Sequence, residues 1–133
     1  MNKLILSSVI LLSLDFVWLG TYMGPRYNKM IREIQGKQMK MNYWSAIITY
    51  ILMIVGLNVF VIPNIREKSA MTDSIKYGFL FGIVLYGVYD FTAATVLDGW
   101  DIGLALLDTL WGGIVYFLTA FMTIKIISYN KYK

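Results

Sequence analysis

Residues 43–62, YWSAIITYILMIVGLNVFVI, decide the fold, because this stretch holds no charged side chain and stops only at Pro63. A helix of roughly 20 apolar residues spans about 30 Å, the thickness of the hydrocarbon core of a bilayer. An isolated strand would leave its backbone groups unpaired in lipid, and a barrel strand would alternate apolar with polar residues. The stretch therefore predicts a transmembrane α-helix.

Three further apolar runs of similar length occur, at residues 4–22, 77–97 and 103–127. Together with 43–62 they predict an all-α integral membrane protein, a four-transmembrane-helix bundle that forms one domain over residues 1–133. The composition agrees, because 58% of the residues are hydrophobic and a soluble domain of this size could not bury them. Residues 4–22 follow Lys3 as in a signal peptide, but no small-residue cleavage site comes after them, so we expect a span.

The first two predicted helices are joined by a basic loop, residues 23–42. Within it, residues 25–35 fit either a solvated loop or a short interfacial helix whose apolar side chains, Tyr27 among them, dip into the headgroups. An even number of spans puts both termini on one side of the membrane. That side holds seven of the Lys and Arg residues and the other side holds five, which favours cytoplasmic termini.

Residue types that are missing exclude several classes of site. The chain has no histidine and no cysteine, so multi-histidine metal sites, Ser-His and Cys-His catalytic pairs and disulfides are excluded. The basic residues lie between apolar runs without an aromatic stacking platform, so we expect no nucleic acid partner. We expect no cofactor and no metal site, and the lipid bilayer as the surrounding partner. Whether the chain is an enzyme stays open.

Three carboxylates inside predicted spans are the strongest functional signal. Asp15 and Asp90 each lie seven residues before the end of a predicted helix, and Asp108 lies five residues after the start of another. At about 1.5 Å per residue, all three would lie roughly 8–11 Å below the same membrane face. Tyr50, seven residues into the second helix, would lie in the same layer. The spacing therefore predicts one layer of polar groups contributed by four helices.

A carboxylate in the bilayer costs at least about 2.5–3.5 kcal/mol, so these side chains should face the interior of the bundle or water. No basic residue lies at their depth, so we expect at least one to be protonated, or the cluster to hold a proton, a cation or a lipid ligand. Nearby candidates for the same site are Trp18, Trp111, Tyr86, Tyr89 and Thr92. Alternatively, the aspartates only hold the helices together by hydrogen bonds. We assign Trp100 to the aromatic belt at the membrane surface.

The motifs that carry these residues are Asp15-x-x-Trp18-Leu19-Gly20, Gly78-x-x-x-Gly82, Tyr89-Asp90-x-Thr92, Trp100 and Asp108-x-x-Trp111-Gly112. In combination they resemble the predicted-membrane-protein family called domain of unknown function 2177, over nearly the whole chain. The resemblance implies a four-helix membrane protein and no particular activity. One departure is Ala93, where the family pattern has an asparagine, so a ligand held by that asparagine would be held differently here.

Three functions fit these observations. The leading hypothesis is a small transporter or channel, a homodimer or higher homo-oligomer, in which Asp15, Asp90 and Asp108 bind a proton or a cation. Asp90, flanked by two tyrosines on the third helix, would be the main titrating group. The alternatives are a lipid-modifying membrane enzyme, with paired carboxyl groups as acid and base, and a non-catalytic membrane assembly subunit.

Overall fold

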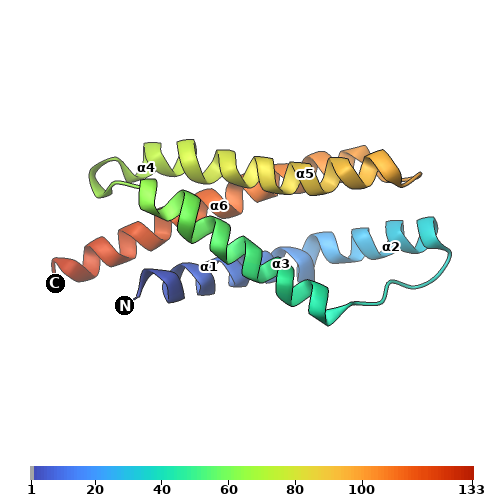
Figure 1. Cartoon of the computed structure of the whole chain (residues 1–133), viewed down its shortest axis with the longest axis horizontal. Helices are drawn as coiled ribbons and strands as arrows, with labels where there is room; N and C mark the ends of the chain where they lie inside the picture. The colour runs from blue at the N-terminus through green and yellow to red at the C-terminus, as the bar shows by residue number, and fades with distance from the viewer. Residues whose placement is uncertain (1) are drawn as a thin grey trace.

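The computed structural model describes residues 2–133, and this part of the chain is helical in four long runs without any strand. The runs are Lys3–Gln35, Tyr43–Asn64, Glu67–Val96 and Ile102–Lys131. Each is long and apolar enough to cross a membrane, which confirms the predicted four-helix architecture. Both termini lie at the same end of the bundle, as an even number of spans requires (Figure 1).

The first run joins α1 (Lys3–Trp18), the π-helical turn η1 (Leu19–Met23) and α2 (Gly24–Gln35) into one continuous helix. The helix considered for residues 25–35 therefore exists, and it continues the first helix and packs on the bundle through Tyr27 and Met30. A proline in a regular α-helix loses a hydrogen bond and clashes with the preceding turn. Here the wider π turn, closed by a bond from the Gly24 N–H to the Leu19 carbonyl, precedes Pro25.

The second run comprises α3 (Tyr43–Gly56), η2 (Leu57–Val61) and η3 (Ile62–Asn64). The third comprises η4 (Glu67–Ser69), α4 (Ala70–Asp73), η5 (Ser74–Phe79) and α5 (Leu80–Val96), and the fourth is α6 (Ile102–Lys131). The side chains of Asn42 and Asp101 accept bonds from backbone N–H groups and so cap α3 and α6. These caps fix where the second and fourth spans begin.

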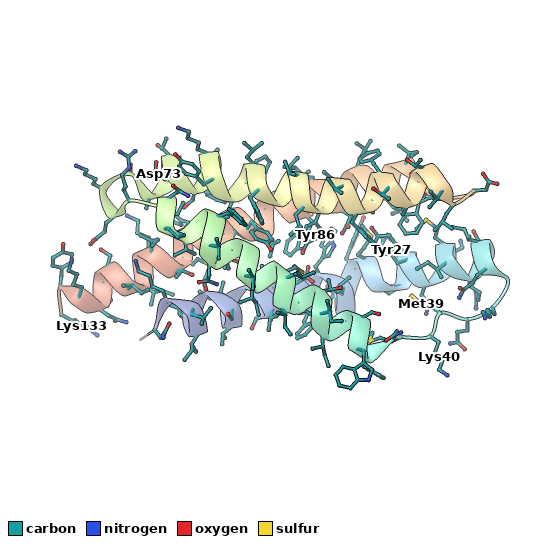
Figure 2. The ribbon with its side chains drawn as sticks, viewed as in Figure 1. Tyr27, Met39, Lys40, Asp73, Tyr86 and Lys133 are labelled. Carbon is teal, nitrogen blue, oxygen red and sulfur yellow. The ribbon has the colours of Figure 1, made fainter. Side chains whose placement is uncertain are left out.

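The helices α5 and α6 touch backbone to backbone at glycines. A Cβ atom added at Gly82 would lie 1.9 Å from the carbonyl oxygen of Gly112, so no side chain fits there. One added at Gly112 would lie 2.3 Å from the ring of Tyr86. Small residues allow such close approach of helices in a membrane. The contact holds Tyr86 over Gly112, and Figure 2 shows this side chain in the middle of the bundle.

The outer surface is apolar and the interior is partly polar, the reverse of a soluble bundle. The exposed side chains of α3 include Ile47, Ile51, Leu52 and Val55, and at the start of the helix Tyr43 and Trp44. Aromatic residues at a helix end mark the level of the headgroups. By contrast, Asp15, Asp90 and Asp108 are all buried. The candidate functional groups therefore face one another and not the lipid.

Candidate functional site

Asp15 of α1 is bound by three other helices. Its carboxylate accepts hydrogen bonds from the Tyr86 hydroxyl at 2.8 Å, the Tyr50 hydroxyl at 3.2 Å and the Trp111 indole N–H at 3.3 Å. The residue is only 5% exposed. Three neutral donors can hold a carboxyl group in a buried place without a basic partner. Asp15, Tyr50, Tyr86 and Trp111 form what we call the inner station.

Asp90 of α5 lies in a second group, with Asp108 of α6 and Tyr27 of α2. The Tyr27 hydroxyl donates to Asp90 Oδ1 at 2.6 Å, whereas Asp90 Oδ2 is buried without a hydrogen-bond partner. The Asp108 carboxyl group lies close enough to interact with both the Tyr27 hydroxyl and the Asp90 carboxyl group. A proton between the two carboxyl groups would give Asp90 Oδ2 the bond that it lacks. Tyr27, Asp90 and Asp108 form what we call the outer station.

Two tryptophans join the stations. The rings of Trp18 and Trp111 stack with centroids 4.7 Å apart and planes 9° apart. Trp18 of α1 donates to Asp108 of α6 at 3.3 Å, and Trp111 of α6 donates to Asp15 of α1. The two Asp-x-x-Trp motifs are thus joined by a crossed pair of hydrogen bonds, in which each tryptophan donates to the aspartate of the other helix. An indole N–H can donate but not accept, so the pair fixes the carboxyl groups and does not itself relay protons.

The π turn η1 explains how one helix serves both stations. Asp15 and Tyr27 are twelve residues apart, so in a regular α-helix they would point about 120° apart around the axis. Since a π turn takes up about one extra residue, the angle falls to about 20° and both side chains face inward. Gly24 makes the turn possible, because a Cβ atom there would lie 2.1 Å from the Leu19 carbonyl oxygen.

Tyr27 is the residue that sequence reasoning did not assign to the site. It is 8% exposed and packs against Trp100 with ring centroids 5.7 Å apart. The available signal was the spacing of Met23, Tyr27, Met30 and Ile34, an apolar face that continues that of α1 once the π turn is taken into account. Figure 2 shows Tyr27 directed between the helices, like Tyr86.

Two candidate site residues lie on the exposed face of α5, and the tryptophan assigned to the aromatic belt is buried. Tyr89 is 57% exposed and Thr92 is exposed, so neither faces the Asp90 carboxyl group. They are one and two residues from Asp90, which turns them about 100° and 200° away from it around α5. Trp100, expected in the surface belt, is 8% exposed, and its indole nitrogen is buried without a partner near Asp90.

Within the described part of the chain, no basic side chain forms an ion pair with these carboxyl groups. The two ion pairs within residues 2–133 are Arg66–Asp73 and Lys131–Glu67, both away from the stations. Across the same residues, no three acidic side chains come close enough together to hold a metal ion. Carboxyl groups that are buried, unpaired and bound by neutral donors are suited to gaining and losing protons.

Comparison with known proteins gives a family and no closer relative. A profile of the family described as "Predicted membrane protein (DUF2177)" matches residues 1–125, which include all the residues of both stations. No curated protein and no solved structure matches the chain. The family profile thus covers all four spans except the last turns of α6, and the chain belongs to this family of predicted membrane proteins.

Proposed function

We propose that the protein moves protons across the membrane, as a small channel or proton-coupled transporter, by way of the inner and outer stations. The observation that carries the proposal is Asp90. One of its oxygen atoms is bound by Tyr27 at 2.6 Å, and the other is fully buried without a donor, beside Asp108. A permanently ionised carboxylate would be costly in this setting, whereas a carboxyl group that shares a proton with its neighbour would not be.

The hydroxyl and carboxyl groups have the chemistry for a relay. A tyrosine hydroxyl both donates and accepts hydrogen bonds, and a carboxyl group can hold a proton or release it. In the outer station a proton would move between Asp90 and Asp108. It would then reach Asp15 through water or a tyrosine hydroxyl, because the stacked indoles between the stations only donate. Intramembrane acidic chains of this kind serve proton transfer in pumps and transporters.

A proton is favoured over a metal cation as the carried species. A metal ion takes several oxygen ligands at once, and Ca²⁺ takes six to eight. The carboxyl groups are divided between two stations, and no metal-binding set of acidic residues occurs in the described chain. Protons need only one carboxyl group at a time. The division into stations therefore supports stepwise transfer.

The test is proton flux into proteoliposomes that contain the wild-type protein or its Asp90→Asn variant. Because acid–base groups typically contribute a factor of about a hundred or more, we expect flux to fall by that factor in the variant. The matched control is Asp98→Asn, which changes an exposed aspartate in the turn between α5 and α6. Normal flux in Asp90→Asn would sink the proposal. Absence of flux from the correctly inserted wild-type protein would shift the assignment to lipid chemistry or an assembly role.

Orientation and assembly belong to the same proposal. We place the termini on the cytoplasmic side, because seven basic residues lie on that side and five on the other. A four-helix bundle is narrow, so we expect copies to associate as a homodimer or larger homo-oligomer. The mass of the protein in lipid nanodiscs would test the association, and protease cleavage of tagged termini in oriented vesicles would test the topology.

A further inference from the structure

Three hydroxyl groups in the half of the bundle nearer the termini are buried without hydrogen-bond partners. They belong to Ser74, Thr119 and Thr123, all 0% exposed. A helical threonine commonly donates to the carbonyl four residues earlier, as Thr109 does to Ala105 at 2.8 Å. Thr119 and Thr123 do not. A buried polar group without a partner is costly, so such groups usually bind ordered water.

The three hydroxyl groups lie within about one helical turn of one another along the bundle. Thr119 and Thr123 are one turn apart on α6. A Cβ atom at Gly78 of η5 would lie 3.0 Å from the carbonyl oxygen of Tyr116, which sets the register between these antiparallel segments. Ser74, about one turn before Gly78, therefore lies beside residues 119–121. Together Ser74, Thr119 and Thr123 form what we call the hydroxyl cluster.

The ring of Tyr116 lies between the hydroxyl cluster and the inner station. Tyr116 lies one turn before Thr119 and Ala120, and its ring packs edge-on against Tyr86 with centroids 6.4 Å apart. Tyr86 in turn donates to Asp15 at 2.8 Å. The Tyr116 hydroxyl donates to the Met53 carbonyl at 2.9 Å, so the link between Tyr116 and Tyr86 is a contact of rings.

The other end of the hydroxyl cluster approaches the surface. A hollow of about 310 Å³ lies between the start of the third run and α6, lined by Ala70, Lys68 and Lys125 among others. Ala70 is one turn before Ser74 on the same side of the helix, and it is 3% exposed. The hollow opens at the end of the bundle that carries the termini, where Figure 2 shows Asp73.

We infer that the hydroxyl cluster holds water that enters from the face with the termini and reaches as far as Tyr116, next to the inner station. The inference rests on the proposed proton transfer. It assigns the route that protons take in the half of the bundle nearer the termini. Water molecules supply the partners that the three hydroxyl groups lack, and each can bond to two or more of them. Asp73, next to Ser74, is held in its ion pair with Arg66, so a chain of water and hydroxyl groups would carry the protons here.

The chain contains no cysteine, so single cysteines can report where water reaches. The matched pair is Thr123→Cys and Ile124→Cys, adjacent residues of α6 at the same depth, 0% and 4% exposed. The thiolate is the reactive form, and a dry apolar site disfavours it. Each unit by which the pKa of a thiol rises lowers its reactive fraction tenfold. In proteoliposomes, we therefore expect a small water-soluble methanethiosulfonate to modify the Thr123→Cys variant at least about tenfold faster.

Equal rates in the two variants, whether slow or fast, would overturn the inference. Thr119→Cys serves as a second reporter, compared with Val115→Cys, which is also fully buried but apolar. The labelling does not depend on transport, so the two proposals can fail separately. A dry cluster together with Asp90-dependent flux overturns only the inferred route. A labelled cluster without flux overturns only the proton function.

Discussion

Asp73 and Asp90 are two buried carboxylates on the same helical run, 2% and 0% exposed, in opposite surroundings. Asp73, at the α3–α4 turn, accepts bonds from the Arg66 guanidinium, the Arg66 backbone N–H and the Ser69 hydroxyl. This contact raises the pKa of the Arg66 guanidinium above its ordinary value. Asp90 has one tyrosine hydroxyl and no cation. A fully bonded ion pair fixes a turn, whereas an unpaired carboxyl group remains able to change its protonation state.

After that of Asp90→Asn, the largest expected loss of flux comes from Gly24→Ala, which tests whether Asp90 depends on the π turn. The added Cβ atom collides with the Leu19 carbonyl oxygen, so the turn must rearrange and rotate Tyr27 away from Asp90. We expect proton flux in proteoliposomes to fall by more than about tenfold, because the outer station loses its donor.

The matched control for this variant is Gly20→Ala in the same turn. A Cβ atom at Gly20 meets no atom within 4 Å, and the residue is exposed, so flux should remain near that of the wild type. Equal loss of flux in both alanine variants would mean that helix flexibility, and not the placement of Tyr27, explains the effect. Unchanged flux in Gly24→Ala would show that the π turn has no part in positioning the outer station.

The sequence predicts the fold because lipid imposes one solution on long apolar runs. The uncharged stretch 43–62 lies within the second helix, 4–22 and 103–127 lie within the first and fourth, and 77–97 exceeds the third only by residue 97. It also predicts that Asp15 and Tyr50 lie at the same level, and their side chains are hydrogen bonded. The depth of Asp15 was nevertheless counted from residue 22, and the first helix does not end there but continues to Gln35.

The outer station could not be predicted in the same way, because its geometry depends on an irregular turn. The apolar run predicts that the first span stops at residue 22, and Gly24 and Pro25 are residues typical of a helix end. The structure continues the helix through a π turn, and this continuation puts Tyr27 beside Asp90. The assignment of Tyr89 rested on its position next to Asp90 in the sequence, although neighbours along a helix point in different directions.

A smaller effect is expected from Tyr27→Phe, which removes from Asp90 the donor that corresponds to Arg66 at Asp73. A hydrogen bond to a charged or strongly polar group contributes about 1.5–3 kcal/mol, and 1.4 kcal/mol corresponds to a factor of ten. We therefore expect about tenfold lower flux, with the fold retained because the ring still packs on Trp100.

The control for the tyrosine is Tyr89→Phe, one residue before Asp90. Tyr89 is 57% exposed and contacts Trp100 through its ring edge, a contact that phenylalanine preserves. Flux should be unchanged in this variant. If the two phenylalanine variants lose flux equally, the hydrogen bond from Tyr27 to Asp90 does not contribute specifically to proton transfer, and Tyr27 does not belong to the outer station.

The smallest expected effect concerns stability. We expect Asp90→Asn and Asp73→Asn to shift the thermal unfolding midpoint in opposite directions. Asp90→Asn keeps an oxygen for Tyr27 and places an N–H donor opposite Asp108, so the site no longer contains a buried carboxyl group that is costly to ionise. Asp73→Asn loses the charge-assisted bonds to Arg66, which a neutral amide cannot replace. Thermal unfolding in detergent, followed by circular dichroism, should therefore show a higher midpoint for Asp90→Asn and a lower one for Asp73→Asn. A lower midpoint for both would mean that Asp90 holds the bundle together just as Asp73 holds its turn, and the proposed division between a structural and a proton-carrying carboxylate would be lost.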